Sequence, residues 1–157
     1  MAEQSVIHST SIIERSYPKP VARVFAAFSD PATKRRWYGE SKSHDVDLYE
    51  MEFRVGGVER ARYRFRQGSP FPGVALTSEG SHLDIVPDKR IVIASTMAMD
   101  GRRFSASLVT FEFLATDKGT DLIFTHQGAF FEGSDGPKMR EDGWRLLLES
   151  LAAELAR

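Results

Sequence analysis

Apolar and polar residues alternate through most of the chain between residues 45 and 125. Tyr49, Met51 and Phe53 alternate with glutamates, for example, and Phe111 and Phe113 belong to a similar run later in the chain. A repeat of two residues is typical of a β-strand with one buried face. Short turns separate these runs, so the region predicts about six strands that follow one another as antiparallel hairpins.

The flanking segments have different patterns. Residues 9–17 are rich in β-branched side chains and predict a first strand. Two short helices should follow, one opened by Pro20 and one ending at Gly39, with Ser29 or Asp30 as the N-cap of the second. A long helix at the end of the chain completes an α+β protein, because its apolar stripe must be buried against the sheet.

The final helix is clearest over residues 141–155, where apolar side chains recur at spacings of three and four. Asp135 is its expected N-cap, and Pro137 fits the first turn. Gly143 stands inside the helix beside Trp144, where glycine costs roughly 1 kcal/mol relative to alanine. We expect Gly143 either to let the helix approach the sheet or to relieve crowding around Trp144.

The first hairpin of the alternating region contains two consecutive glycines. A two-residue loop would place charged and apolar side chains on the same face of the hairpin. A three-residue loop over residues 55–57 instead sets Met51 opposite Ala61 and Tyr49 opposite Tyr63, which keeps the faces separate. We therefore predict the three-residue loop, with one glycine in the left-handed conformation.

Four arginines, at positions 60, 62, 64 and 66, fall on the outer face of this hairpin. They could form a patch for an anion or for nucleic acid. We favour a solvated ladder of ion pairs with Glu50 and Glu52, because the net charge of the chain is −1 and no global field attracts nucleic acid. No nucleic-acid partner is expected.

Composition narrows the chemistry further. The 157 residues suggest one domain, and the absence of cysteine excludes disulfides, thiolate catalysis and zinc–thiolate sites. No apolar run approaches the ~20 residues of a membrane-spanning helix, so no membrane insertion is expected. The first ten residues lack the apolar centre of a signal peptide, and a cytoplasmic location is the default expectation. Residues 69–73, with two prolines and a glycine, predict a loop.

Through five segments, the chain resembles the bacterial single-domain proteins that are similar to the C-terminal domain of the activator of the heat-shock-chaperone ATPase, within the START/SRPBCC, or birch-pollen-allergen-like, superfamily. The segments are VFAAFSDPATKRRWYG (Val24–Gly39), FRVGG (Phe53–Gly57), GSHLDIVPDKRIVIAST (Gly80–Thr96), GTDLIFTHQGAF (Gly119–Phe130) and DGWRLLLESLAAEL (Asp142–Leu155). The resemblance implies a helix-grip fold, in which a curved antiparallel sheet of six to seven strands surrounds the C-terminal helix and encloses a hydrophobic cavity. It implies one domain over residues 1–157, with a core at about 9–156.

The resemblance says less about chemistry, because one fold can carry many functions. The first hypothesis is a protein that binds a small hydrophobic or aromatic molecule. The second is a cofactor-free enzyme of the polyketide cyclase or hydrolase type. The third is a chaperone-associated module of the stress response. The third has less support, because 157 residues leave no room for the separate chaperone-binding domain of the eukaryotic co-chaperone. A homodimer through a sheet edge or the cavity mouth is left open.

Two polar residues are in phase with the predicted interior. His126 follows Leu122 and Phe124 at even spacing, and Tyr63 follows Ala61. Either could orient a ligand or act as a general acid or base in an enzyme, or could simply be a hydrogen-bonded core residue. The other three histidines have no ligand spacing, so neither a metal site nor a cofactor is expected.

The candidate ligand-binding residues share an expected inward direction or a place near the cavity mouth. They are Trp37, Tyr38, Phe53, Tyr63, Phe65, Ile93, Met97, Phe111, Phe113, Phe124, His126, Trp144 and Leu148. An apolar stripe of this kind is also what an ordinary core produces, and only the volume of the interior separates the two interpretations.

Overall fold

The computed structural model describes residues 5–40, 44–68 and 72–157. Its main element is a seven-stranded antiparallel sheet with the order β1-β7-β6-β5-β4-β3-β2. The strands are β1 (Ile7–Tyr17), β2 (His44–Met51), β3 (Val58–Phe65), β4 (Ala75–Val86), β5 (Arg90–Met99), β6 (Arg102–Thr116) and β7 (Gly119–Phe130). Strands β2 to β7 follow one another in order, as the alternating pattern predicted. The predicted loop at 69–73 lies mostly outside the described residues.

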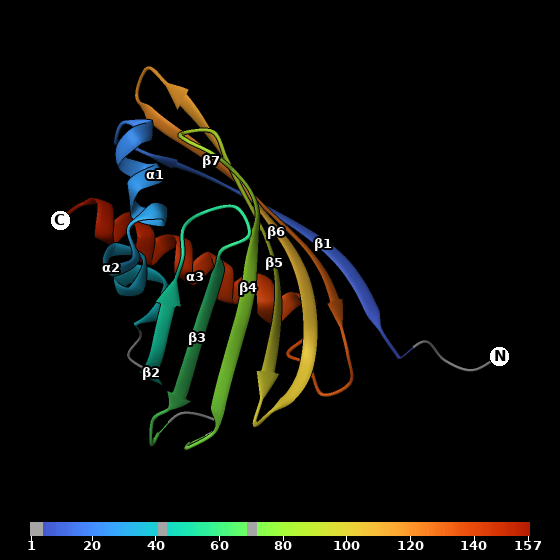
Figure 1. The fold of residues 1–157 in the computed structure, drawn as a ribbon. Helices are drawn as coiled ribbons and strands as arrows, with labels where there is room; N and C mark the ends of the chain where they lie inside the picture. The colour runs from blue at the N-terminus through green and yellow to red at the C-terminus, as the bar shows by residue number, and fades with distance from the viewer. Residues whose placement is uncertain (1–4, 41–43, 69–71) are drawn as a thin grey trace.

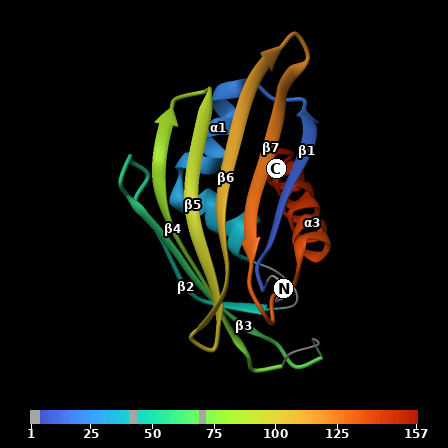
Figure 2. The same cartoon turned by 90° about the vertical axis from the view of Figure 1, so that its right-hand side faces the viewer.

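All the helices lie on one side of the curved sheet (Figures 1 and 2). They are α1 (Val21–Ser29), α2 (Pro31–Lys34), a π-helical segment η1 (Arg35–Gly39) and α3 (Pro137–Leu155). The long helix α3 crosses the concave face, and the two short helices lie beside its C-terminal half (Figure 1). The α+β helix-grip architecture expected from the resemblance is confirmed.

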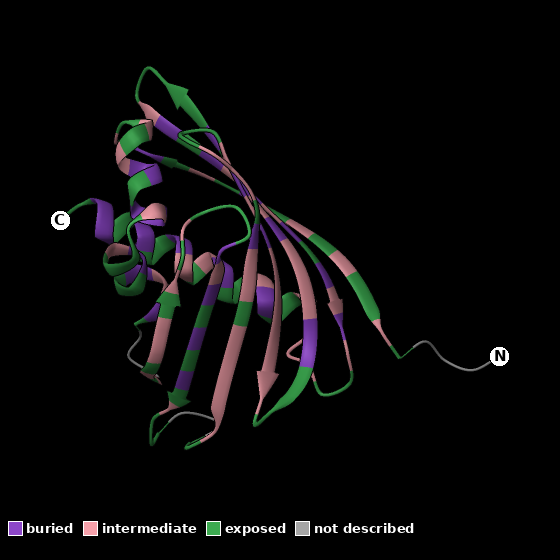
Figure 3. Ribbon diagram, in the orientation of Figure 1, coloured by how far each residue is buried: buried purple, intermediate pink, exposed green. Residues whose placement is uncertain are grey.

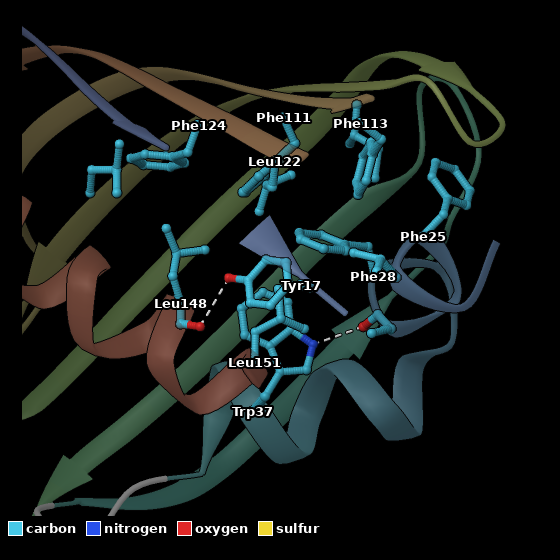
Figure 4. Packing of buried hydrophobic residues seen from close by; sticks show 14 of the residues in the cluster. Tyr17, Phe25, Phe28, Trp37, Phe111, Phe113, Leu122, Phe124, Leu148 and Leu151 are labelled. Atoms are coloured by element: carbon cyan, nitrogen blue, oxygen red, sulfur yellow. Dashed lines mark hydrogen bonds between the residues drawn. The ribbon is translucent and has the colours of Figure 1, made fainter. Parts of the chain in front are cut away.

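Burial follows the predicted alternation (Figure 3). Phe111, Phe113 and Phe124 of β6 and β7 are at most 4% exposed and lie on the face covered by the helices, while the intervening residues point outward. Two hydrogen bonds fasten the helices to this core (Figure 4). The Tyr17 hydroxyl donates to the carbonyl of Leu148 at 3.0 Å, and the Trp37 Nε1–H donates to a carbonyl of α1 at 2.8 Å.

The start of α2 confirms a predicted cap. The Asp30 carboxylate accepts a hydrogen bond from the Thr33 amide at 3.1 Å, and Pro31 occupies the first turn. The helix then widens into η1, which ends at Gly39 as expected. Helices of the π type are rare and often mark functional sites.

The predicted register of the β2–β3 hairpin is wrong by two residues. Tyr49 lies opposite Ala61, and Met51 lies opposite Glu59. Phe53 leaves the strand and packs its ring edge-on against Phe25, with 5.7 Å between centroids, so the loop covers residues 52–57. The shift keeps the two faces of the hairpin separate and sets Met51 opposite Glu59, which is on the inner face with Ala61. The left-handed glycine was predicted correctly, since Gly56 has φ 81°.

The expectations for the start of α3 are also wrong. Asp135 does not cap the helix; Gly136 precedes it with φ 85°, and the Asp135 carboxylate pairs with Arg140 instead. Gly143 is exposed, and a Cβ built there would meet no atom within 4 Å. Gly143 therefore neither permits a close approach to the sheet nor relieves crowding.

The arginines on the outer face of β3 form ion pairs across the hairpin. Arg60 lies 3.9 Å from Glu50, Arg64 lies 3.1 Å from Asp47, and Arg66 lies 2.8 Å from Asp45. The solvated ladder is thus present with different partners, because the register shift removes Glu52 from it.

Candidate functional site

A small pocket lies between η1, α3 and the inner face of the sheet. Its volume is about 30 Å³. It is lined by Lys34, Tyr38, Glu59, Ser78, Gly80, Ile93, Ser95, Val109, Phe111 and Trp144. One wall is apolar, whereas the opposite end carries two charged side chains. A space of this size holds only one or two water molecules.

The local sequence of the short helices explains how the pocket is covered. Lys34, Trp37 and Tyr38 are spaced three and four residues apart, so they share the face that turns toward the sheet. Trp37 is fixed by its hydrogen bond to α1 and by an edge-on contact with Phe28 at 5.0 Å between ring centroids. Tyr38 extends beyond Trp37 to Trp144 of α3, with ring centroids 5.8 Å apart. The rings of Tyr38 and Trp144 cover one side of the pocket.

A buried ion pair forms the polar end of the pocket. Lys34 is 2% exposed and Glu59 is 7% exposed, and Lys34 Nζ lies 3.0 Å from Glu59 Oε2. The Tyr49 hydroxyl donates a hydrogen bond to the same carboxylate oxygen. The ammonium also lies over the Tyr38 ring, 4.7 Å from its centroid, which is a cation–π contact.

The charge of Glu59 influences three tyrosines, Tyr38, Tyr49 and Tyr63. Burial raises the pKa of Tyr49 and of Tyr38, and the negative charge of Glu59 raises both further. Burial also raises the pKa of Tyr63 well above its ordinary value, with smaller contributions from Tyr38 and Glu59. The phenols therefore stay protonated at neutral pH and can act as hydrogen-bond donors, as Tyr49 does.

A second ion pair, partly buried, lies near the start of α3. The Arg140 guanidinium binds the Asp135 carboxylate with two hydrogen bonds of 2.7 and 2.9 Å, and donates a third of 2.8 Å to Ser105 Oγ. It lies over the Phe130 ring at 5.2 Å. Burial and the positive charge of Arg140 lower the pKa of nearby His126 to about 4. His126 is therefore neutral and only weakly basic at neutral pH.

Aromatic side chains fill most of the remaining interior (Figure 4). Phe28 contacts Phe111 and Phe113 edge-on, with centroids 4.9 and 5.1 Å apart, and Phe25 contacts Phe113 at 5.3 Å. Ligand pockets for small molecules usually have volumes of about 300–1,000 Å³. Side chains therefore occupy the region where the resemblance implies an open hydrophobic cavity.

The structure brings only part of the predicted site residues together. Tyr38, Ile93, Phe111 and Trp144 line the pocket. Trp37, Phe113, Phe124 and Leu148 are buried in the apolar core instead. Phe53 packs against this core, Phe65 lies beside His44 with ring centroids 6.2 Å apart, and Met97 is partly exposed on β5.

The two catalytic candidates are not in the pocket lining. Tyr63 packs against the His44 ring at 4.6 Å between centroids, and His126 lies between the Phe124 and Phe130 rings at 6.3 and 6.0 Å. Tyr63 is linked to the pocket only indirectly: Tyr38 and Glu59, which line the pocket, also raise the pKa of Tyr63. His126 belongs to the surroundings of the Arg140 pair.

Four polar residues of the pocket were not among the candidates from the sequence: Lys34, Glu59, Ser78 and Ser95. A signal for two of them was present. Glu59 is in phase with Ala61 and Tyr63 on the inner face of β3, and Lys34 is in helical phase with Trp37. Two inward positions that carry opposite charges, as Lys34 and Glu59 do, are what a buried ion pair requires.

Across residues 5–40, 44–68 and 72–157, no cluster of three or more histidine or carboxylate side chains could hold a metal ion. None of the helices in this part of the chain is long and apolar enough to cross a membrane.

Comparison with known proteins places the chain in a family. Residues 18–156 match the model of the family described as Activator of Hsp90 ATPase homolog 1-like protein. No curated protein is significantly similar in sequence.

Solved structures agree with this match. Mll3558 from Rhizobium loti is 46% identical over 96% of this chain and 99% of its own, with a TM-score of 0.85. An uncharacterised protein from Rhizobium leguminosarum is 35% identical over 98% and 97%, with a TM-score of 0.90. The AHSA1-like protein from Aeromonas hydrophila shares the fold at 20% identity over 94% and 92%, with a TM-score of 0.70. The chain therefore belongs to the family of Activator of Hsp90 ATPase homolog 1-like proteins.

Proposed function

We propose that the protein binds a small hydrophobic or aromatic molecule in the pocket between Tyr38, Trp144 and strands β3 to β6. The observation that carries the proposal is the composition of this pocket. Ile93, Val109 and Phe111 offer an apolar wall, and a few polar groups converge at the other end. An apolar surface with few, well-placed polar groups is typical of sites for small molecules.

Binding requires the pocket to open, because about 30 Å³ is smaller than any aromatic ring. Tyr38 is the side chain best placed to move. It is only partly buried, and it covers the pocket at the end of the short η1 segment. Trp144 is held more firmly, since it contacts Phe124 at 4.5 Å and Phe111 at 5.9 Å between ring centroids. We expect ligands to displace the Tyr38 ring and to stack against Trp144.

The geometry offers less support for an enzyme. A general base and a general acid must both reach the reacting atoms. His126 and Tyr63 do not line the same pocket, and His126 has a pKa of about 4. A chaperone partner has no specific surface in the described part of the chain that argues for it, beyond the name of the family.

The first test is native mass spectrometry of the freshly purified protein, followed by denaturation and identification of any small molecule released. A stoichiometric apolar or aromatic molecule is the expected result. Thermal-shift measurements with a broad panel of lipids and aromatic compounds complement it. If no bound molecule is found and no compound shifts the melting temperature, the proposal is contradicted. Attention would then turn to protein partners.

Two variants on β5 test whether the ligand binds in this pocket. Ser95→Leu adds an apolar side chain to the lining and should abolish binding while the protein still folds. Thr96→Leu is the matched control, because the neighbouring residue of a strand points to the opposite face of the sheet. Equal binding by both variants would place the ligand elsewhere.

A further inference from the structure

The two charges in the pocket balance each other. Lys34 and Glu59 are the charged residues of its lining, and the remaining polar members, Tyr38, Ser78 and Ser95, are neutral hydroxyls. The Arg140–Asp135 pair near the start of α3 is also balanced. The lining of the pocket therefore has no net charge.

Several contacts hold the two side chains of the pair in place. The Glu59 carboxylate accepts hydrogen bonds from Lys34 and from Tyr49, and the Lys34 ammonium gains a cation–π contact with Tyr38. The two side chains come from α2 and β3, 25 positions apart in the chain. A buried pair of this kind loses much of its stabilisation when a third charge competes for either partner.

A ligand that carried a charge would create such competition. A carboxylate would draw Lys34 away from Glu59, and an ammonium would draw Glu59 away from Lys34. Either one would leave an uncompensated charge in a closed site, which is strongly unfavourable. A hydroxyl or carbonyl group, in contrast, could form hydrogen bonds to the serine hydroxyls or to the pair without changing the charge balance.

We propose that the Lys34–Glu59 pair makes the pocket selective for uncharged aromatic molecules that carry a hydroxyl or carbonyl group, against acids and amines of the same shape. The pair acts as a specificity filter, since discrimination can come from a penalty for the wrong ligand as well as from attraction to the right one. The inference rests on the proposed binding function and names its ligand class.

Three probes of one shape test the inference at pH 7: 2-phenylethanol, phenylacetate and 2-phenylethylamine. They carry no charge, one negative charge and one positive charge. Isothermal titration calorimetry measures their dissociation constants for the wild-type protein. We expect 2-phenylethanol to bind at least about tenfold more tightly than either ion, because an uncompensated charge in a closed site is strongly unfavourable.

Charge variants of the pair should change this order in opposite directions. Glu59→Gln gives the pocket a net positive charge and should make phenylacetate the preferred probe. Lys34→Met gives it a net negative charge and should favour 2-phenylethylamine. The double variant Lys34→Met/Glu59→Gln is neutral again, so the preference for an ion that either single variant introduces should disappear. If Lys34→Met does not fold, Glu59→Gln and the double variant still decide the matter.

Different outcomes would contradict the charge filter alone or the proposed binding function as well. Equal affinity of the wild-type protein for the three probes, with binding blocked by Ser95→Leu, would overturn the charge filter and leave the binding function intact. An unchanged order of affinities in Glu59→Gln would also overturn the filter. If the protein binds none of the probes and no compound of the wider panel, both the charge filter and the binding function are overturned.

Discussion

The ion pairs Arg140–Asp135 and Lys34–Glu59 differ in how they are held. Arg140 and Asp135 are five positions apart, and the guanidinium forms two hydrogen bonds to the carboxylate and a third to Ser105. Lys34 and Glu59 come from separate elements, and within the described residues the ammonium donates its hydrogen bonds to Glu59. The first pair is a local fastening of α3, and the second joins the helical segment to the sheet.

The difference in donor chemistry matters for function. A guanidinium with a bidentate partner and a further acceptor has little capacity left for a ligand. An ammonium has three donors and a compact charge, so Lys34 can respond to a new group in the adjacent pocket. Of the two pairs, the one formed by Lys34 borders the pocket and is the one to which we assign selectivity.

The largest expected effect comes from breaking the Lys34–Glu59 pair. Lys34→Met leaves Glu59 buried without its cation, so the free energy of unfolding should fall by about 3–5 kcal/mol. Urea denaturation at pH 7 measures this change. Lys138→Met is the control, because its pair with Asp142 is exposed and its loss should leave stability unchanged within error.

The double variant Lys34→Met/Glu59→Gln sharpens this measurement. It removes both charges, and stability should return most of the way toward wild type. A loss of less than about 1 kcal/mol in the single variant would mean that water reaches Glu59 and that the pocket is not a closed site.

Breaking the other pair should cost less. In Arg140→Met the remaining Asp135 side chain is 22% exposed, so water can replace part of the lost hydrogen bonding. We expect a loss of about 1–3 kcal/mol in the same denaturation experiment. A larger loss than in Lys34→Met would reverse the comparison between the two pairs.

The pH dependence of stability reports on the surroundings of Arg140. The pKa of His126 in the folded protein is about 4, below its ordinary value of 6.5. Between these values the unfolded chain binds more protons than the folded one, so stability should fall as the pH decreases from 6.5 to 4, by at most about 1.4 kcal/mol per pH unit for this one group. Urea midpoints at several pH values, compared with His126→Gln, measure the contribution.

The same histidine responds to Arg140 directly. Burial is the larger cause of the low pKa, and the charge of Arg140 is the second. An NMR titration of Arg140→Met should therefore show the pKa of His126 raised but still below 6.5. An unchanged value would show that Arg140 has no electrostatic influence on His126.

The sequence predicted the architecture well because each element has its own periodicity. Repeats of two residues identified the strands, and the spacing of Trp144, Leu148 and Leu151 identified α3. Register was harder, because Phe53 continues the alternating pattern although its backbone has left the strand. Periodicity alone cannot locate the point where pairing stops.

The site was predicted only in part, for a related reason. Lys34 stands in the run KRR and resembles a residue of a basic surface helix. Its burial depends on Glu59, which lies on the inner face of β3 but is far from Lys34 in the sequence. Asp135 likewise stands at a position typical of an N-cap, but its carboxylate forms an ion pair with Arg140. Such contacts between distant side chains are set by packing rather than by local pattern.

The smallest effect concerns Gly143, one turn beyond Arg140 on α3. A side chain there would meet open space, so the glycine only costs the helix conformational entropy. Gly143→Ala should raise the free energy of unfolding by about 1 kcal/mol without changing either ion pair. Gly57→Ala is the opposite control, because its Cβ would lie 2.2 Å from the Glu52 carbonyl oxygen and should destabilise the hairpin loop. If Gly143→Ala also destabilised the protein, the exposed face of α3 would have to be covered in solution, and a second copy of the chain would be the first partner to test by sedimentation.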